Sequence, residues 1–211
     1  MKYIVVLGDG MSDRDIKELG NKTILDVAKK PNIDGLKGIM GMVKTVPDTL
    51  KPGSDVANLA VMGYNPLECY TGRSPLEAVS IGIKMKDSDV AIRCNLVTLS
   101  DEEDIKKRKM LDYSAGEIST DESKELIKAV EEALGDSEFK FYPGISYRHC
   151  LIWDKGQTGL DLTPPHDISD RVTGEYLPKN DKLFKLMERS YDILKNHPVN
   201  IKRIEEGKNP A

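Results

Sequence analysis

Residues 2–10 read KYIVVLGDG, a short β-branched run that stops at two glycines flanking Asp9. An apolar run of this length is typical of a strand that is buried on both faces of a parallel sheet. The two glycines then form a tight loop at the carboxyl edge of the sheet, where open α/β folds bind ligands. The sequence therefore predicts an α/β protein that places Asp9 at a ligand-binding edge.

The segment that follows completes a βαβ pattern. Thr23 is a helix cap, and a short helix is predicted over 23–30, where Pro31 ends it. A second short helix is predicted over 32–37. Residues 38–46 (GIMGMVKTV) alternate well enough for another strand.

Two helix starts come next. The run PGSD at 52–55 opens a helix over 56–62 that Gly63 closes, so Ser54 or Asp55 lies at or just before its N-terminus. The run RSPLE at 73–77 predicts a helix over 76–83, with Ser74 as the N-cap of a capping box. Simple helix initiation explains this second pattern equally well.

The character of the sequence changes near residue 89, and a second, smaller α/β unit is predicted from there to residue 176. Its amphipathic helix is the strongest element, because apolar side chains recur on one face of it. The elements expected after residue 88 are a strand over 90–99, a charged connection over 101–109, a helix over 120–134, strands over 139–142 and 147–153 around Pro143-Gly144, an ordered loop over 163–179, and a final helix over 182–195. The polar segment 197–211 offers little to fold on its own.

Composition excludes several classes of protein. The chain has 31 basic and 35 acidic residues, a net charge of −4, and no broad basic face for nucleic acid. Its longest apolar run, 3–7, is far below the roughly 20 residues of a membrane span, and no signal peptide is expected. The three cysteines, an odd number without CxxC spacing, predict reduced thiols in the cytoplasm.

Asp9 and Ser54 together indicate a chemistry. A carboxylate that follows a buried strand suits a hard divalent cation, although such aspartates also form turns. A serine at a helix start can be a nucleophile that meets donors for a phosphoryl oxygen, or an ordinary N-cap. Combined, the two can share a metal ion, which lowers the pKa of the serine hydroxyl. This is the logic of metal-assisted phosphoryl transfer through a phosphoserine.

A series of ordered motifs then makes a specific resemblance. They are YIVVLGDGM (3–11), TVP (45–47), PGSDVANL (52–59), MGYNP (62–66), YTGRSPLEA (70–78), RCNLVT (93–98), YSAG (113–116), PGISYRH (143–149) and PHDI (165–168). The chain resembles the archaeal-type, cofactor-independent phosphoglycerate mutases of the alkaline phosphatase superfamily, and the resemblance runs from residue 1 to the end.

The resemblance implies an alkaline phosphatase-like three-layer α/β/α core, incomplete in this chain, with a smaller inserted α/β domain. The domains would be 1–88 for the N-terminal part of the metal-binding core, 89–176 for the inserted domain that closes over the substrate, and 177–211 for a helix and segment returning to the core.

The resemblance also implies a glycolytic isomerase that interconverts 3-phosphoglycerate and 2-phosphoglycerate without 2,3-bisphosphoglycerate. Two divalent metal ions, Mn²⁺ or Mg²⁺, would have Asp9 and Ser54 among their ligands, and Ser54 would accept the phosphoryl group. Arg93, Arg148 and His166 are the candidates for binding the carboxylate and phosphate or for moving a proton. His149 is left out, because it follows Arg148 along a strand and faces the other way.

The sequence departs from the family where further metal ligands are needed. Its only histidines are His149, His166 and His197, and no Asp-His dipeptide occurs. The remaining ligands are therefore expected outside the chain, which corresponds to roughly the N-terminal half of such an enzyme. We expect the 211 residues alone to be inactive. The incomplete core would leave an open sheet edge, so self-association into a homo-oligomer or aggregation is a further expectation.

Three alternatives stay open from the sequence. The first is another phosphotransferase or phosphohydrolase of the superfamily. The second is a homoserine kinase, a label that similar sequences carry, although no Walker motif or glycine-rich ATP loop supports it. The third is a non-catalytic module that binds a phosphorylated ligand.

Overall fold

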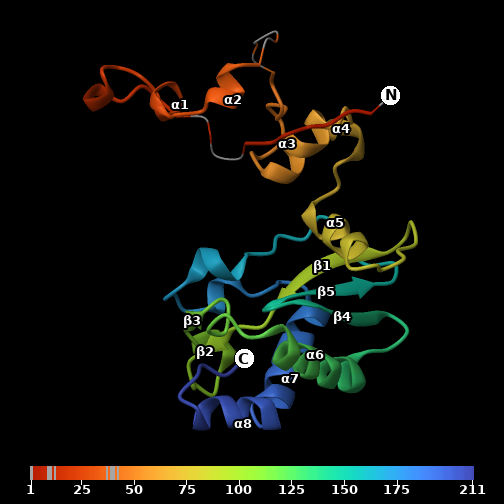
Figure 1. The fold of residues 1–211 in the computed structure, drawn as a ribbon. Coiled ribbons are helices and arrows are strands. Elements are labelled where there is room, and N and C mark those ends of the chain that lie inside the picture. Colours follow the sequence, from red (N-terminus) through yellow and green to blue (C-terminus); the bar gives the residue numbers. More distant parts are fainter. Residues whose placement is uncertain (1, 9–10, 12, 37, 39–40, 42) are drawn as a thin grey trace. The chain divides into compact units, whose positions relative to one another are not determined.

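The chain divides into two compact units, residues 1–44 and 45–211 (Figure 1). The computed structural model describes residues 2–8, 11, 13–36, 38, 41 and 43–211. Asp9 therefore lies outside the described residues. Among the described residues, no helix has both the length and the hydrophobicity that crossing a bilayer requires.

In the described part of the first unit, the short helices are η1 (Lys17–Leu19), α1 (Ile24–Val27) and α2 (Pro31–Asp34). Thr23 caps α1 as predicted, and it forms a reciprocal capping box in which its Oγ1 accepts from the N–H of Asp26 at 3.1 Å. The helix ends earlier than predicted, and Pro31 opens α2.

The buried strand predicted over residues 2–7 is wrong. These residues form no strand, and their side chains are exposed, with Ile4 87% and Val6 89% accessible. A central strand needs a hydrogen-bonded neighbour, and no strand among the described residues pairs with this segment. The strand predicted over 38–46 falls partly outside the described residues, and its described positions form none. The βαβ unit is therefore absent from the described part of the chain.

The second unit carries both sheets. Its helices are α3 (Ser54–Val61), α4 (Pro66–Cys69), α5 (Arg73–Ser80), η2 (Ile105–Lys107), α6 (Thr120–Leu134), η3 (Pro165–Ile168), η4 (Gly174–Tyr176), α7 (Asp181–Leu194) and α8 (Pro198–Glu205). Its strands are β1 (Val90–Asn95), β2 (Thr98–Leu99), β3 (Met110–Asp112), β4 (Phe139–Ile145) and β5 (Arg148–Trp153).

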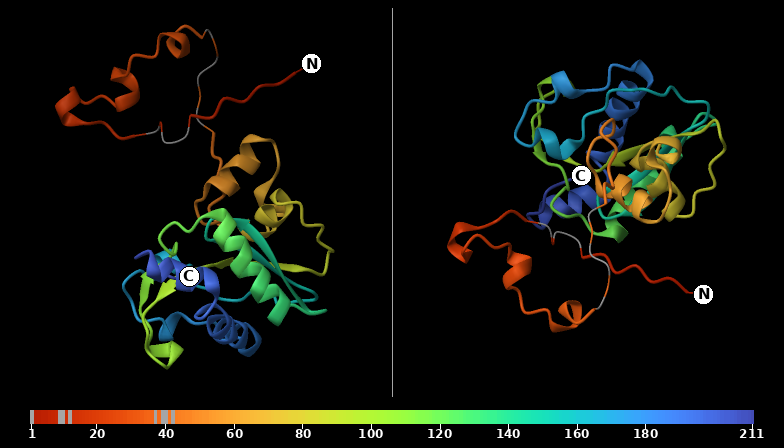
Figure 2. Two further views of the ribbon diagram at one scale, coloured as in Figure 1. Left: turned by 60° about the horizontal axis from the view of Figure 1, so that its bottom comes forward. Right: turned by 90° about the horizontal axis from the view of Figure 1, so that it is seen from above.

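The larger sheet has the strand order β1-β5-β4, and β2 and β3 form a separate pair. Helix α5 covers one face of the larger sheet, while α6 and α7 cover the other (Figures 1 and 2). The predicted mixed α/β class is confirmed. All strand pairs in the described residues are antiparallel, however, which differs from the parallel sheet that the first residues suggested. The domain limits at residues 88 and 176 stay a prediction.

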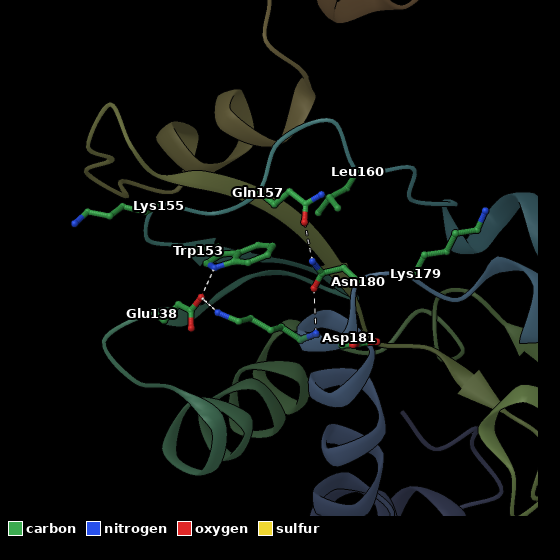
Figure 3. Close-up of a pocket in the computed structure, with 9 residues that line it drawn as sticks. Glu138, Trp153, Lys155, Gln157, Leu160, Lys179, Asn180 and Asp181 are labelled. Atoms are coloured by element: carbon green, nitrogen blue, oxygen red, sulfur yellow. Dashed lines mark hydrogen bonds and ion pairs between the residues drawn. The ribbon is translucent and has the colours of Figure 1, made fainter.

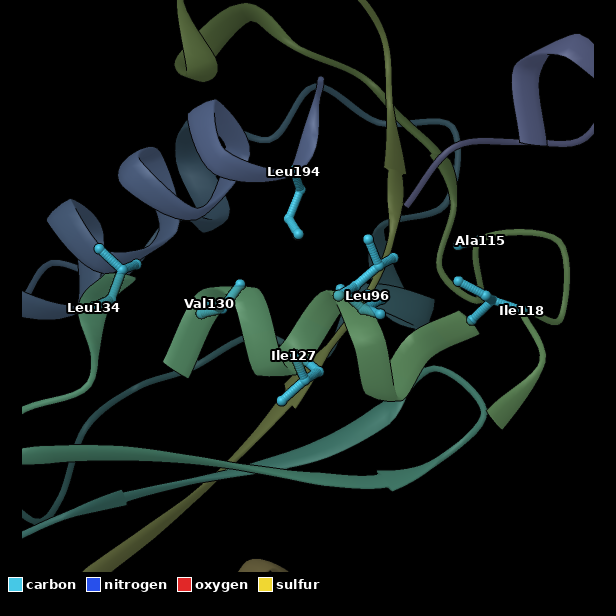
Figure 4. Close-up of a cluster of buried hydrophobic side chains, with 8 residues drawn as sticks. Leu96, Ala115, Ile118, Ile127, Val130, Leu134 and Leu194 are labelled. Carbon is cyan, nitrogen blue, oxygen red and sulfur yellow. The ribbon is translucent and has the colours of Figure 1, made fainter. Parts of the chain in front are cut away.

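Helix α6 has the predicted bounds because its capping residues and its apolar pattern indicate the same segment. Ser119 and Glu122 form a capping box at its start, and its apolar stripe is buried between the sheet and α7 (Figure 4). The buried cluster around it consists of Leu96, Ala115, Ile118, Leu126, Ile127, Val130, Leu134 and Leu194.

The strand predictions needed two local corrections. The strand predicted over 90–99 breaks after Asn95, because Leu96 turns its side chain into the α6 cluster. The β4–β5 hairpin turns at Ser146, which has a φ of 52°, and not at Pro143-Gly144. Gly144 lies inside β4, where a Cβ would collide with the carbonyl oxygen of Arg148, so the close approach of the two strands requires glycine.

The C-terminal segment corrects a further prediction. Residues 198–205 form α8, although the segment 197–211 is too polar to suggest a folded element. Two of its polar side chains, Asn200 and Arg203, are buried and hydrogen-bonded. The Nδ2 of Asn200 donates to the carbonyl of Leu194 at 2.9 Å, and the Nη1 of Arg203 lies 2.9 Å from Glu122 Oε2 on α6. Hydrogen bonds to partners elsewhere in the fold replace the missing apolar stripe.

Candidate functional site

Ser54 is the first residue of α3, and its side chain is exposed. Gly53 occupies the N-cap position in extended conformation, so Ser54 is not an N-cap. Because the capping role falls to another residue, the hydroxyl of Ser54 is available to a ligand. Asp9, the predicted metal ligand, lies outside the described residues.

A line of polar side chains leads from the start of α3 to the start of α5. The hydroxyl of Tyr70 donates a 2.6 Å hydrogen bond to Asp55 Oδ2, and the N–H of Val56 donates to Oδ1 at 3.0 Å. Partial burial raises the pKa of Asp55, but these hydrogen bonds and the charge of Arg73 outweigh it, so the pKa lies below its ordinary value. Burial and the adjacent carboxylate raise the pKa of Tyr70 to about 12.

Glu77 continues this line to the sheet. Its Oε1 lies 3.0 Å from Arg73 Nε, and its Oε2 lies 3.4 Å from Arg93 Nε. The buried Nε of Arg93 makes this ion pair without a hydrogen bond. The predicted capping box of α5 is therefore wrong: Gly72 is the N-cap, no side chain caps the helix, and Glu77 binds two arginines instead of the helix start.

Arg93 and Arg148 lie on the same face of the sheet, on neighbouring strands. Cys150 is opposite Arg93, and Asn95 is opposite Arg148, so the two arginines are diagonal neighbours within reach of one ligand. Among the described residues no carboxylate pairs with Arg148, which is exposed and has its guanidinium 5.4 Å from the ring of Tyr147. This face offers an anion one free and one partly neutralised guanidinium.

His166, in η3, joins Arg148 through two rings. Tyr113 lies edge-to-face with His166, with ring centroids 6.2 Å apart, and edge-to-face with Tyr147, with centroids 5.8 Å apart. His166 is exposed, and its Nε2 is 3.4 Å from Asp167 Oδ1. The structure thus connects two predicted residues, Arg148 and His166, through side chains that the sequence did not single out.

The predicted site residues fall into two groups. Arg93, Arg148 and His166 lie on or beside the sheet, whereas Ser54 lies at the start of α3, where its chain neighbour Asp55 begins the line through Arg73 and Glu77. Sequence reasoning missed Tyr70, Arg73, Glu77 and Tyr113, although all four stand inside the motifs 70–78 and 113–116. The i,i+4 spacing of Arg73 and Glu77 was a usable signal for their ion pair.

The described residues contain no group of three or more His, Cys, Asp or Glu side chains placed to hold a metal ion. Ser54 and the undescribed Asp9 are two oxygen donors of the kind that Mn²⁺ and Mg²⁺ prefer, but they do not make up a complete site.

A separate depression of about 640 Å³ lies at the start of α7 (Figure 3). Glu138 accepts hydrogen bonds there from Trp153 Nε1 at 2.8 Å and from Lys182 Nζ at 2.5 Å, and Asn180 donates to Gln157 at 3.0 Å. None of the predicted site residues lines this depression. Its polar groups are largely satisfied by one another, so it does not compete with the arginine face as the candidate site.

Comparison with known proteins decides the family. The family model for 2,3-bisphosphoglycerate-independent phosphoglycerate mutase matches residues 36–200. The chain belongs to the 2,3-bisphosphoglycerate-independent phosphoglycerate mutase family. A Geobacter sulfurreducens protein is 51% identical to this family member over 216 residues, and a Methanosarcina barkeri 2,3-bisphosphoglycerate-independent phosphoglycerate mutase is 49% identical over 217 residues. The cofactor-independent phosphoglycerate mutase of Thermoplasma acidophilum is similar in structure, with a TM-score of 0.55 and 26% identity over 95% of the chain.

This phosphoglycerate mutase family member spans about half the length of the curated relatives it matches. Both alignments cover 100% of the chain, but only 54% of the Geobacter protein and 53% of the Methanosarcina protein. The Thermoplasma structure is covered to 55%.

In this mutase family member, His149 points toward the face of the sheet that α6 covers, and Arg148 points toward the opposite face. It is 3% exposed, and its Nδ1 accepts the N–H of Gly144 at 3.1 Å. The neutral ring therefore carries its proton on Nε2, which is buried without a partner. Burial lowers the pKa of His149 from 6.5 to about 4.

We expect His149 to make the fold sensitive to acid. The unfolded chain binds a proton at this residue below about pH 6.5 and the folded chain only below about pH 4, so the free energy of unfolding falls as the pH drops through this range. The expected loss is about 3 kcal/mol. Urea unfolding at pH 7 and pH 4 measures it. His149→Asn keeps an acceptor for Gly144 without titrating, so it should show a shallower pH dependence. Equal pH dependence in both proteins would contradict the assignment.

Proposed function

We propose that the full-length protein interconverts 3-phosphoglycerate and 2-phosphoglycerate, with Ser54 as the phosphoryl acceptor and Arg93, Arg148 and His166 as substrate-binding residues. The observation that carries the proposal is the exposed Ser54 hydroxyl at the start of α3, next to Asp55, from which a line of polar side chains runs through Arg73 and Glu77 to an arginine face that can take an anion. The names of the relatives support the same reaction. The cytoplasm as the location and self-association of the isolated chain are further predictions.

The proposed chemistry has two balanced transfers. In the first, Ser54 Oγ forms a bond to the phosphorus of 3-phosphoglycerate, the bond from phosphorus to the 3-oxygen breaks, and the serine proton ends on that oxygen. In the second, the 2-hydroxyl of glycerate attacks the phosphoserine, the bond from phosphorus to Oγ breaks, and the proton returns to Ser54. Glycerate must stay bound between the two transfers, because the phosphoryl group returns to the same molecule.

The arginines supply this retention. A guanidinium binds a carboxylate or a phosphoryl group through two parallel N–H donors. Arg148 has no competing carboxylate among the described residues, so it can bind the glycerate carboxylate. The ion pair with Glu77 fixes the guanidinium of Arg93 beside it. His166 is exposed and has donor and acceptor nitrogens, and it is the candidate for carrying the proton between Ser54 Oγ and the glycerate oxygen in each transfer.

Two divalent ions, Mn²⁺ or Mg²⁺, belong to this proposal with Asp9 and Ser54 among their ligands. The described residues do not form such a site by themselves. The remaining ligands are expected outside this chain.

An enolase-coupled assay tests the proposal on the protein at the full length of its relatives. With Mn²⁺ and without 2,3-bisphosphoglycerate, we expect 3-phosphoglycerate to be converted to 2-phosphoglycerate, and we expect EDTA to abolish the conversion. Homoserine with ATP is the matched arm and should remain unchanged. Consumption of homoserine while 3-phosphoglycerate is left intact would overturn the proposal. The 211-residue chain, assayed beside it, should be inactive.

A further inference from the structure

We propose that Tyr113 is a positioning residue whose ring sets the places of Arg148 and His166, and that α8 holds Tyr113 in position. The proposal rests on the proposed function to the extent that Arg148 and His166 bind substrate. Tyr113 stands between the rings of Tyr147 and His166, in edge-to-face contact with both. Edge-to-face pairs are directional, so the ring fixes orientation as well as distance.

The loop that presents Tyr113 has an uncommon backbone. Ala115, Gly116 and Glu117 follow one another with φ values of 50°, 67° and 52°. Left-handed residues other than glycine persist only where the surroundings hold them, and they concentrate at functional sites. The carboxylate of Asp112 supplies part of this hold, because it accepts from the N–H of Ser114 and the N–H of Gly116, each at 2.8 Å.

The C-terminal segment supplies the rest. Arg203 is 3% exposed, and its Nη2 donates to the carbonyl oxygen of Ala115 at 2.6 Å. The Nδ2 of Asn209 donates to Asp112 Oδ2 at 3.2 Å. Helix α8 and the residues after it therefore hold the left-handed run directly at Ala115 and, through Asp112, at Gly116, although they contact neither Arg148 nor His166 in any of these bonds.

Both partners of Tyr113 are tied to the same loop. Ser146, in the hairpin turn just before Tyr147, donates from its Oγ to the carbonyl of Ile118 at 2.7 Å. The segment that follows η3 is bound to β3, because the N–H of Asp170 donates to the carbonyl of Met110 at 2.9 Å. The backbones that carry Arg148 and His166 are thus fastened next to Tyr113, and its ring lies between the rings of Tyr147 and His166.

Tyr113 does not behave as an ordinary core residue. Its side chain is 36% exposed, and within the described residues its hydroxyl makes no hydrogen bond. If Tyr113 served only to bury apolar surface, a position fully covered by neighbouring side chains would stabilise the fold more. The ring contacts with Tyr147 and His166 are the interactions that its position provides.

The experiment uses the whole 211-residue chain and two readouts. The first is the position of the ring signals of His166 in ¹H–¹³C NMR spectra of histidine-labelled protein, assigned with His166→Gln. The second is the affinity for 3-phosphoglycerate, measured by titration in the same samples. Tyr113→Leu removes the ring, Tyr113→Phe keeps it, and Asn209→Ala loosens the loop from its C-terminal support. Tyr191→Leu is the control. It removes a ring on α7 whose centroid lies 3.5 Å from the guanidinium carbon of Arg108.

We expect Tyr113→Leu to move the His166 signals and to weaken binding of 3-phosphoglycerate about tenfold. Tyr113→Phe should keep the wild-type values of both, Asn209→Ala should move the signals by a smaller amount, and Tyr191→Leu should leave them in place. Unmoved His166 signals in Tyr113→Leu, or an equal movement in Tyr191→Leu, would overturn the proposal. If Tyr113→Leu does not fold, unmoved signals in Asn209→Ala overturn it.

Failure of the two proposals can be told apart. If the wild-type chain does not bind 3-phosphoglycerate, the substrate-binding role of Arg148 and His166 in this chain is contradicted, and the His166 signals alone decide whether Tyr113 positions that ring.

Discussion

Replacement of Ser54 by alanine is expected to abolish the mutase activity of the full-length protein, lowering kcat/KM by at least about 10⁴-fold. The reason is that both transfers pass through Oγ, so the variant has no acceptor for the phosphoryl group. A change in fold is not expected, because Ser54 is exposed and makes no cap hydrogen bond in α3. The enolase-coupled assay measures the loss, and urea unfolding verifies that the variant is folded.

Ser190→Ala is the matched control for this prediction. Ser190 also lies in a helix, and its Oγ donates to the carbonyl of Met187 at 2.8 Å, on α7 and outside the proposed site. This variant should retain full activity. A Ser54→Ala protein that keeps more than about a tenth of wild-type kcat/KM would show that another residue accepts the phosphoryl group.

The second large effect concerns stability. Arg203→Met is expected to lower the free energy of unfolding by about 3–5 kcal/mol, since it removes a side chain that is 3% exposed and deprives the partly buried carboxylate of Glu122 and two backbone carbonyls of this donor. Arg203 donates hydrogen bonds to three groups: the carboxylate of Glu122 at 2.9 Å, the carbonyl of Ala115 at 2.6 Å and the carbonyl of Asn209 at 2.8 Å. Methionine fills similar volume but satisfies none of them. Urea unfolding at pH 7 measures the change.

Arg189→Met provides the control for Arg203, because Arg189 is exposed on α7. Its effect should stay within about 0.5 kcal/mol. The double variant Arg203→Met, Glu122→Gln should recover part of the loss, because it removes the unpaired carboxylate. A loss below about 1 kcal/mol in Arg203→Met would contradict the role of α8 as a support of the loop that carries Tyr113.

The elements predicted well from sequence are those whose local signals agree with one another. Helix α6 has its capping box, its amphipathic stripe and its packing in one place, and its bounds were predicted without error. The helix over 198–205 was not predicted from the sequence. It is stabilised by hydrogen bonds from Asn200 and Arg203 to distant partners, and such bonds leave no periodic pattern in the sequence. The strand predicted over 2–7 is wrong for the complementary reason. β-branched residues favour a strand, but a strand also needs a neighbouring strand, and none of the strands in the described part of the chain pairs with this segment.

Strand alternation correctly separated Arg148 from His149, which lie on opposite faces of the sheet. The sequence could not show that Glu77 joins Arg73 to Arg93, because the second of these ion pairs depends on how α5 packs on the sheet. It also gave no sign of Tyr113, whose ring contacts depend on a left-handed turn held by residues about ninety positions later.

The most direct test of the account is whether Ser54 becomes phosphorylated during turnover. Full-length protein incubated with 3-phosphoglycerate and Mn²⁺, quenched and digested, is analysed by peptide mass spectrometry, with Ser54→Ala as the parallel sample. We expect one phosphoryl group on Ser54 of the wild-type protein and none on the same peptide of the variant. Turnover of 3-phosphoglycerate without phosphorylated Ser54, or with the phosphoryl group on another residue, would contradict it.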